Sequence, residues 1–419
     1  MSDFLALLRS NRNYRYTWLA QVVSEAGDYF NNIAVFSLAL QTTGSGLVVS
    51  GVMLARAIPA AAAGPVAGVA LDRFDRRRIM IASDLIRAAV AAAFLLAVGR
   101  PRPGLLYALS ALLMFASPFF SSGRAAILPA IATPGELHTA NSLTQTTQWA
   151  TLTAGTLAAG YATAWLGYRG AFLFNALSFV FSAWAIAKLR LPRGGIQPRR
   201  NSLRPWADYR DGLRYMRSVP LILGIAMISV GWATGGGAAQ ILFALFGEQV
   251  FHRGPAGIGT IWGMAGVGLL LGGALGHWTG RRTGFSGYKR TISAAYISHG
   301  LTYVLFSQME NYAAALAMIL LSRVGMAVSS VLNQYQLLRH TPDEFRGRIF
   351  STLESLRWAV MIGSMAAAGI ASQYFSPRAI GLVAGVLSSL TAVWWTWADF
   401  TGRLPEPQEG QPADRRAPG

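Results

Sequence analysis

The sequence predicts an all-α membrane protein in which twelve helices cross the bilayer. Three observations lead to this fold class. Hydrophobic residues make up 53% of the 419 positions, and the mean hydropathy of +0.37 is well above that of a soluble domain. The apolar residues form twelve runs of the length that a bilayer core requires, about 20 helical residues each. Short bursts of basic residues stand between the runs and bring the formal net charge to +18.

The first six spans are expected where apolar runs alternate with short polar breaks. Tyr14, Tyr16 and Trp18 form an aromatic belt at the start of the first span, as residues at the membrane interface do. Four arginines in the segment 73–78 separate the second span from the third. The predicted spans are 16–41, 47–70, 79–98, 104–127, 142–166 and 170–189.

The last six spans follow the longest polar interruption of the chain, at 190–218. They are predicted at 219–246, 256–277, 291–308, 312–333, 351–373 and 378–399. Trp394, Trp395 and Trp397 form a second aromatic belt at the end of the last one. The interruption is expected to be a cytoplasmic linker between an N-terminal half, 1–189, and a C-terminal half, 219–400. The segment 401–419 has the Pro, Gly and charge content of a disordered cytoplasmic tail.

The basic residues predict how the spans are oriented. If the N-terminus is inside, the outer loops hold only Arg100, Arg102, Arg169, Arg253 and Arg378, and the basic bursts between spans are cytoplasmic. This asymmetry is the positive-inside bias, and an even number of spans returns the C-terminus to the cytoplasm. The segment 1–18 also lacks the order of charged head, apolar core and cleavage site of a signal peptide.

Composition and motifs exclude several classes of function. Without cysteine there is no disulfide and no thiolate metal site. The basic residues are scattered rather than gathered on one face with stacking aromatics, so nucleic-acid binding is not expected. The sequence has no nucleophile motif, and its glycine-rich run "GVGLLLGG" at 266–273 lies inside a span without a following lysine. We therefore expect neither an enzyme nor an ATP-driven pump, and no cofactor.

The chain contains an internal repeat. Sliding the sequence by 208 residues aligns "ATPGELHTANS" at 132–142 with "HTPDEFRGRIF" at 340–350. The same offset brings Gly64, Gly68 and Arg73 onto Gly272, Gly276 and Arg281. Two separate motifs at one offset predict two six-helix halves in parallel topology, with a substrate site between them near the bilayer midplane.

The segment "GVALDRFDRRR", at 68–78, resembles the loop signature of the major facilitator superfamily. Together with the twelve spans, the repeat and the basic central loop, the resemblance covers essentially the whole chain. The segments "SDLIRA" (83–88), "GRAAILPAI" (123–131) and "TPDEFRGRIFS" (341–351) are similar to the branch that contains macrolide-type drug exporters and the enterobactin exporter. The resemblance implies a monomeric transporter in the bacterial inner membrane.

Two positions depart from the family pattern. Asp75 stands where the loop signature usually has glycine, which puts the turn in doubt. The fifth helix of exporters often carries Gly-Pro-x-x-Gly-Gly, and here Gly155 to Gly160 is "GTLAAG", which weakens any inference about the direction of transport.

The first span carries a polar stripe. Gln21, Glu25, Asp28 and Asn32 are spaced four, three and four, so they share one face of a helix. Charge at the membrane centre costs about 2.5 to 3.5 kcal/mol, so such residues are functional candidates. An ion pair of Arg56 in the second span with Asp28 or Glu25 is expected. Three interpretations stay open: an ion pair that only joins two helices, a proton-coupling carboxylate, or direct binding of a cationic substrate or metal ion.

The repeat makes the stripe asymmetric. At the offset of 208, Glu25, Asp28 and Arg56 meet uncharged residues, and only Asn32 meets a similar side chain, Gln240. A requirement of the scaffold should have left charge in both halves, so the asymmetry favours function. The run Gly235 to Gly237 offers either a bend in the seventh span or close packing against other helices.

Two further polar residues lie deep in the C-terminal half. Arg323 could attract an anionic substrate or pair across the cavity, but a hydrogen-bonding role within the core is preferred. His299 is likewise expected to be a core histidine.

Charges near the cytoplasmic ends of the spans indicate a gate. The resemblance implies that Asp72 meets the eleventh helix while the arginines pair with nearby acids in the outward-open state. The expected gate residues are Gly68, Asp72, Arg73, Arg76, Asp84, Arg87, Arg124, Glu354 and Arg357.

These observations together predict a secondary transporter that works by alternating access. The expected activity is proton-coupled efflux of a small amphipathic compound, such as a drug or a siderophore. The alternative within the same fold is transport of a metal ion or a lipid, and a remote alternative is a membrane scaffold or receptor that transports nothing.

Overall fold

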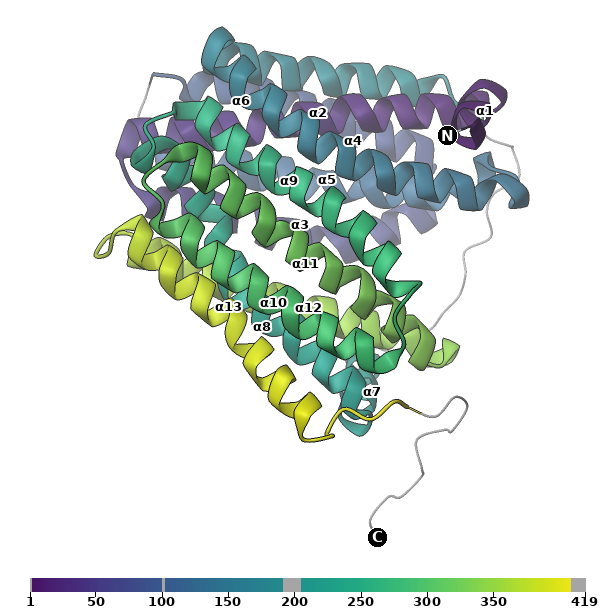
Figure 1. Ribbon diagram of the computed structural model, residues 1–419. Coiled ribbons are helices and arrows are strands. Elements are labelled where there is room, and N and C mark those ends of the chain that lie inside the picture. The colour runs from purple at the N-terminus through teal and green to yellow at the C-terminus, as the bar shows by residue number, and fades with distance from the viewer. Residues whose placement is uncertain (1, 100–101, 191–204, 408–419) are drawn as a thin grey trace. The chain divides into compact units, whose positions relative to one another are not determined.

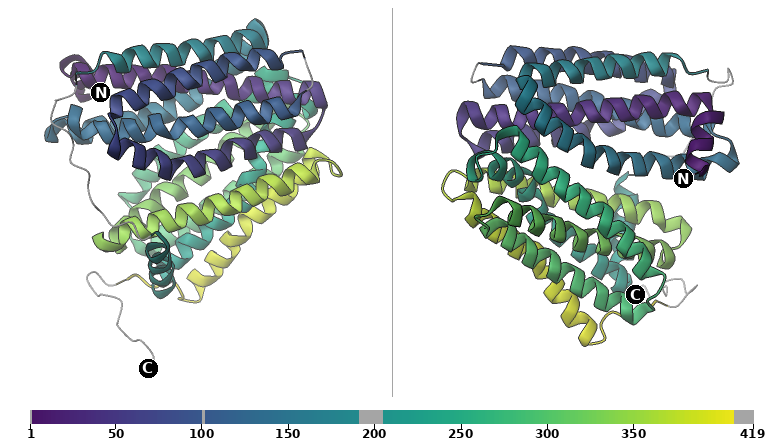
Figure 2. Two further views of the ribbon diagram at one scale, coloured as in Figure 1. Left: turned by 180° about the vertical axis from the view of Figure 1, so that it is seen from behind. Right: turned by 45° about the horizontal axis from the view of Figure 1, so that its top comes forward.

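The computed structural model describes residues 2–99, 102–190 and 205–407. These residues are almost entirely helical, and none of them lies in a strand. The chain forms two compact units, Met1–Arg200 with Phe243–Gly266, and Asn201–Leu242 with Val267–Gly419. Figures 1 and 2 show the long helices of each unit lying side by side.

The first unit is built from long helices in chain order. They are α1 (Ser2–Ser10), α2 (Arg12–Thr43), α3 (Gly46–Arg73), α4 (Arg76–Ala93) with a short 3-10 turn η1 (Phe94–Ala97), α5 (Pro103–Ile131) and α6 (Pro134–Ala187). Helix α6 contains both the fifth and the sixth predicted spans, which join at Gly167. The backbone of Gly167 has φ +71°, a left-handed conformation that glycine adopts without steric cost.

The second unit contains α7 (Pro205–Ser218) and most of α8 (Pro220–Leu245), which continues into a π-helical turn η2 (Phe246–Val250). The helices that follow are α9 (Gly254–Gly280), α10 (Phe285–Gln308), α11 (Tyr312–His340), α12 (Asp343–Ala371) and α13 (Pro377–Phe400). With α6 counted as two spans, the helices α2 to α6 and α8 to α13 correspond to the twelve predicted spans of the fold.

The segment 243–266 belongs to the first unit because it makes close contacts there. The Ser37 hydroxyl donates to Glu248 Oε2 at 2.8 Å. A Cβ on Gly259 of α9 would lie 2.5 Å from the carbonyl oxygen of Thr156 in α6, so only glycine allows these backbones to approach so closely. The division into halves at 189 and 219 remains a prediction from the repeat.

Local capping explains where several helices begin. The Asn11 side chain accepts the Tyr14 N–H at 2.9 Å at the start of α2. Asp75 caps α4 by accepting the Arg78 N–H at 3.1 Å, with φ −59°. The turn at Asp75 therefore does not require the glycine that the family signature usually has there. The backbone of Asp75 lies in a region of φ and ψ that every residue can adopt.

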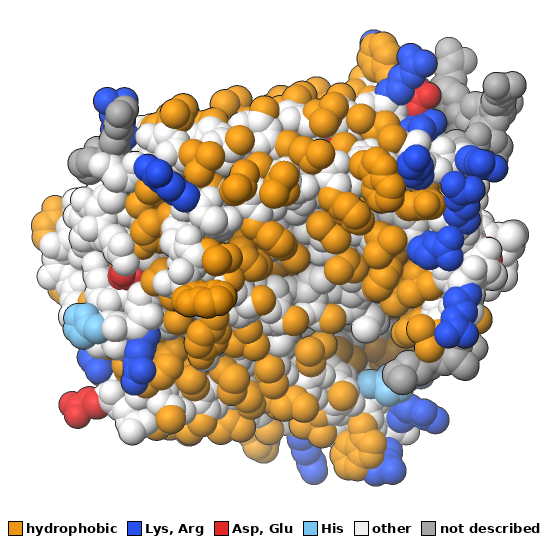
Figure 3. Space-filling view, turned by 90° about the horizontal axis from the view of Figure 1, so that it is seen from above, with side chains coloured by type: hydrophobic (Ala, Val, Ile, Leu, Met, Phe, Trp, Pro, Cys, Tyr) orange, Lys and Arg blue, Asp and Glu red, His pale blue; other side chains and the backbone are white. Residues whose placement is uncertain are grey.

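Eight helices of the described residues are long and apolar enough to cross a membrane. One of them, Gly135–Ala187, carries two predicted spans. Helices α2, α10 and α12 are long enough but more polar, and they hold Asp28, His299 and Glu354 respectively. On the face drawn in Figure 3, hydrophobic side chains cover the middle and Lys and Arg gather near the edges, as expected for a protein surrounded by lipid.

The second part of the predicted linker is a helix rather than an irregular segment. Helix α7 packs on α12, where Asp211 Oδ2 lies 3.5 Å from Arg348 Nη1 and the rings of Tyr215 and Phe345 stack at 4.7 Å. A Cβ on Gly212 would lie 2.9 Å from the Arg348 carbonyl oxygen. Residues 191–204 of the linker lie outside the described residues.

The segment predicted as a disordered tail begins with an ordered stretch. Leu404 is 1% exposed and belongs to the hydrophobic core of the second unit. Its carbonyl accepts a hydrogen bond from Lys289 Nζ at 3.2 Å. Residues 408–419 lie outside the described residues.

Candidate substrate and coupling site

The polar stripe of α2 lies inside the first unit, where α2 packs along the whole of α6. Small residues allow this close packing, since a Cβ on Gly27 would lie 2.0 Å from Ser178 Oγ. Gln21 is 1% exposed and donates from Nε2 to the Thr144 carbonyl at 3.1 Å. The first residue of the stripe therefore fixes α2 against α6.

Glu25 is paired with an arginine from another helix. Arg124 Nη1 of α5 lies 3.3 Å from Glu25 Oε1, and the Thr151 hydroxyl of α6 donates to Glu25 Oε2 at 2.7 Å. Both charged side chains are mostly buried, at 19% and 16% exposure. Three helices thus meet at this carboxylate.

Asp28 faces a different arginine. Its Oδ2 lies 4.0 Å from Arg87 Nη1 of α4, and its Oδ1 has no hydrogen-bond donor among the described residues. The Arg87 guanidinium lies 4.8 and 4.3 Å from the ring centroids of Phe120 and Phe179, and it also contacts Asp84 one turn away on α4. Arg87 is therefore shared between two carboxylates.

The expected ion pair of Arg56 with a stripe carboxylate is not what the structure contains. Arg56 Nη1 of α3 instead donates to Asn31 Oδ1 at 3.4 Å. The charges of Arg56 and Asp28 still act on each other, but within the described residues the nearest cation of Asp28 is Arg87. The arginines that lie within ion-pair distance of the stripe carboxylates come from α4 and α5 instead.

Three residues expected at the cytoplasmic gate belong to this site. Asp84 and Arg87 are 0% and 2% exposed, and Arg124 contacts Glu25. Their spacing from the ends of the spans indicates the water-facing edge, but Asp84 and Arg87 lie more than two turns inside α4, which begins at Arg76, and Arg87 and Arg124 contact carboxylates of α2. The site therefore contains three carboxylates and three arginines: Glu25, Asp28, Asp84, Arg56, Arg87 and Arg124.

Comparison with known proteins identifies the family. The sequence model of the Major Facilitator Superfamily matches residues 17–360, which is most of the chain. The chain belongs to the Major Facilitator Superfamily. It is a membrane transporter rather than an enzyme, and the fold predicted from its loop signature is confirmed.

Several relatives of this transporter align over nearly their full length. An uncharacterised MFS-type transporter of Bacillus subtilis, YfiS, is 26% identical over 402 residues, covering 91% of this chain and 92% of its own. The multidrug efflux pump Tap of Mycolicibacterium fortuitum is 27% identical over 388 residues, covering 88% and 93%. The crystal structure of a bacterial homologue of the iron transporter ferroportin has a TM-score of 0.72 and 18% identity, with 92% and 98% covered. This last likeness concerns the fold alone.

The other residues of the first unit that are expected to form the gate lie near the turn between α3 and α4. Asp72 and Arg73 are exposed, and Arg76 Nη2 lies 3.9 Å from Asp72 while its Nη1 donates to the Ala126 carbonyl at 2.9 Å. A Cβ on Gly68 would meet no atom within 4 Å, so packing in this unit does not require that glycine. The gate contact of Asp72 with the eleventh span remains a prediction.

Glu354 and Arg357 are found in the second unit. Arg357 Nη2 lies 2.6 Å from Glu354 Oε2, and the Trp358 indole donates to Glu354 Oε1 at 2.9 Å. These side chains are partly exposed on α12. Their expected role as gate partners of Asp72 and Arg73 also remains a prediction.

The two buried polar residues of the second unit make core contacts. His299 Nδ1 lies 2.8 Å from Ser322 Oγ, and that hydroxyl donates to the His299 carbonyl at 3.1 Å. Arg323 Nη1 lies 3.3 Å from Met326 Sδ, and its guanidinium lies 5.8 Å from the centre of the Tyr303 ring. These contacts favour the core interpretation of both residues.

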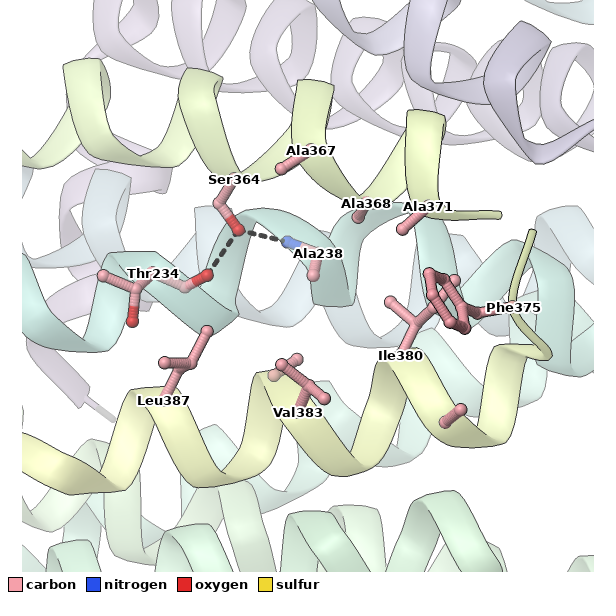
Figure 4. A pocket seen from close by; sticks show the side chains of 12 residues that line it. Thr234, Ala238, Ser364, Ala367, Ala368, Ala371, Phe375, Ile380, Val383 and Leu387 are labelled. Atoms are coloured by element: carbon pink, nitrogen blue, oxygen red, sulfur yellow. Dashed lines mark hydrogen bonds between the residues drawn. The ribbon is translucent and has the colours of Figure 1, made fainter. Parts of the chain in front are cut away.

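The glycine run of α8 packs closely against α12 and α13 and is also contacted by a hydroxyl of α12. A Cβ on Gly235 would lie 2.1 Å from the Ala384 carbonyl oxygen of α13, and one on Gly237 would lie 2.3 Å from the Met361 carbonyl oxygen of α12. The Ser364 hydroxyl accepts the Ala238 N–H at 3.0 Å and donates to the Thr234 carbonyl (Figure 4). In a regular helix these two backbone groups are hydrogen-bond partners of each other, so the insertion of Ser364 places a hydroxyl against one step of the hydrogen-bond ladder of α8.

An apolar pocket of about 280 Å³ adjoins this insertion within the second unit. Figure 4 shows side chains of α8, α12 and α13 pointing into it. Its lining consists of alanines and larger apolar residues apart from Thr234 and Ser364. Gln240, the counterpart of Asn32 in the repeat, is half-buried further along α8 and is not part of this lining.

Several contributors to the site were not predicted from the sequence. Asn31 is 0% exposed and accepts from Arg56, whereas Asn32 had been chosen for its spacing. The sequence does not distinguish Thr151, Phe120 and Phe179 from ordinary core residues, because threonine and phenylalanine are common in apolar helices. Among the described residues no group of three His, Asp or Glu side chains is placed to hold a metal ion.

Proposed function

We propose that this transporter exports a small amphipathic compound in exchange for protons, by alternating access, and that Glu25 and Asp28 carry the coupled proton. The observation that supports this most is the pairing within the first unit. Two carboxylates on one face of α2 each face an arginine from another helix, Arg124 at 3.3 Å and Arg87 at 4.0 Å. Charge pairs in a membrane interior typically mark proton or substrate pathways.

The arrangement suits coupling for a physical reason. An ionised carboxylate in a low-dielectric interior is stable only while a cation compensates it. A proton that binds Asp28 or Glu25 removes the negative charge and releases the arginine from the ion pair. The protonated and the deprotonated pair then favour different conformations of the helices that carry them. In this way a proton gradient can shift the equilibrium between the two access states of the transporter.

The relatives support efflux as the direction of transport. Tap is a multidrug efflux pump, and BacE of Bacillus subtilis, which is 24% identical to this chain, is a putative bacilysin exporter. The stripe offers amides and carboxylates beside apolar helix faces, which matches an amphipathic compound. The proposal includes a position in the bacterial inner membrane with both termini in the cytoplasm, which rests on the positive-inside bias.

Transport into inverted membrane vesicles tests this function. We would impose a pH gradient, use ethidium as an amphipathic fluorescent probe, and compare the wild type with Asp28→Asn and Glu25→Gln. We expect gradient-driven uptake to be lost in at least one variant while ethidium binding to the purified protein persists. Asp399→Asn, which removes a partly buried carboxylate paired with Lys289 in the second unit, serves as the matched control. If both stripe variants keep gradient-driven uptake, the coupling assignment is wrong.

A further inference from the structure

The third carboxylate of the site has no role in the function proposed so far. Asp84 is 0% exposed, whereas the Asp28 side chain is 24% exposed and thus the one that water can reach. Both contact the same cation, Arg87, and Asp84 makes the closer contact. Keeping an ionised carboxylate fully buried costs free energy. Asp84 also competes with Asp28, the proposed proton carrier, for the charge of Arg87.

Of the three carboxylates in the site, Asp28 is the one without an arginine of its own. Glu25 pairs with Arg124 and Asp84 pairs with Arg87. Arg56 completes the three cations, but its hydrogen bond goes to the neutral Asn31. Asp28 is therefore the carboxylate whose compensation depends on a cation that another residue already holds.

The surroundings of Arg87 limit how its guanidinium can move. The Phe120 ring of α5 and the Phe179 ring of α6 both lie within cation–π distance of the guanidinium, and these contacts restrain the plane of the group. Its N–H donors all lie in that plane. The group can therefore turn its edge toward Asp84 or toward Asp28 without leaving the two rings.

We propose that Asp84 is a positioning residue, which acts on Asp28 through Arg87. This inference rests on the proposed coupling role of Asp28. Asp84 draws the guanidinium away, so that Asp28 is compensated only in part and can take and release a proton during the transport cycle. When Asp28 is protonated, Arg87 pairs with Asp84 alone. When Asp28 loses its proton, its carboxylate attracts Arg87 again.

Other charged and titratable groups also face Asp28, and the test must keep them constant. They are Glu25 and Tyr29 on α2 itself, Arg56 from α3, Asp84 and Arg87 from α4, and, through Glu25, Arg124 from α5. Helix α6 contributes the Thr151 hydroxyl to Glu25 and the Phe179 ring to Arg87. Apart from Asp84 itself, none of these groups is altered by a substitution at Asp84.

The test is an infrared titration of the purified full-length protein in lipid nanodiscs. The carbonyl-stretch band of a protonated carboxyl is followed against pH, and the part that disappears in Asp28→Asn is assigned to Asp28. In Asp84→Asn the guanidinium is free to compensate Asp28, so we expect the midpoint of the Asp28 band to move to lower pH, by about one to three units. Asp399→Asn should leave it in place.

A second variant shows whether the effect passes through Arg87. The double substitution Asp84→Asn with Arg87→Gln replaces both partners of the Asp84–Arg87 pair, so neither is left buried without the other, and Asp28 loses its nearest cation. We expect its Asp28 midpoint to lie at higher pH than that of Asp84→Asn alone. An Asp84→Asn midpoint that stays unchanged or moves to higher pH overturns the inference, and so does a double variant that matches Asp84→Asn.

The inference and the proposed function can fail separately. If the Asp28 midpoint shifts as expected but Asp28→Asn still takes up ethidium along the pH gradient, the coupling role is wrong and the positioning contact is real. If Asp28→Asn loses gradient-driven uptake but the midpoint does not respond to Asp84→Asn, Asp84 has no positioning role.

Discussion

At the scale of single residues, the sequence was a better guide to the side chains of the candidate site than to the partners of those side chains. The spacing of Glu25 and Asp28 placed both on one helix face, and the structure brings both to buried arginines. The partners were misassigned because consecutive helices were assumed to pair. Which arginine lies opposite a carboxylate depends on the rotation of α4 and α5 about their axes, and a single sequence does not contain that information.

Gly27 gives a prediction at this scale. A Cβ there would lie 2.0 Å from Ser178 Oγ and 2.7 Å from Asn175 Oδ1, so Gly27→Ala has to push α6 away from α2. Overpacking of this kind typically costs about 1 to 3 kcal/mol. We expect a lower midpoint of thermal unfolding for the purified variant. Gly64→Ala in α3 is the control, because a Cβ there meets no atom within 4 Å. Equal unfolding midpoints for the two variants would show that the close contact at Gly27 is not rigid.

At the scale of elements, the hydropathy pattern predicted every long helix, since apolar runs of bilayer length leave little choice of structure. It did not predict α7, whose residues are polar and whose helix is supported by contacts with α12. Of the two interpretations of the α8 glycines, the structure shows the close packing, and a bend at this run remains a prediction. Small residues let α12 and α13 approach, and this approach is what allows Ser364 to reach the α8 backbone.

Ser364→Ala tests that insertion. Without the hydroxyl, the Ala238 N–H and the Thr234 carbonyl lose the group that bridges them, and a lost hydrogen bond to a buried polar group costs about 1 to 3 kcal/mol. We expect a lower midpoint of thermal unfolding and faster hydrogen exchange at the Ala238 amide. Ser355→Ala on the same helix removes a hydroxyl that bonds only to its own helix, at the Ser351 carbonyl, and should change neither quantity. If hydrogen exchange at the Ala238 amide is unchanged in Ser364→Ala, the Ala238 N–H and the Thr234 carbonyl form a hydrogen bond with each other without the Ser364 hydroxyl.

At the scale of the whole molecule, the account depends on an asymmetry between the repeats. The repeat at 208 residues predicted two related halves, and Glu25, Asp28 and Arg56 of the first half have no charged counterpart in the second. In the described residues, the carboxylates and arginines of the candidate site all lie in the first unit. The family and fold followed from the sequence because loop signature and span count are local patterns. The identity of the substrate did not, because a binding cavity is shaped by side chains from many helices.

Proton movement during transport tests the central claim most directly. Purified protein would be reconstituted in liposomes that contain a pH-sensitive dye, and ethidium would be added outside. The account predicts that the internal pH rises as ethidium enters the wild-type liposomes, and that Asp28→Asn or Glu25→Gln abolishes this rise. Ethidium entry without a pH change in the wild type, or the same number of protons per ethidium in both variants, would contradict it.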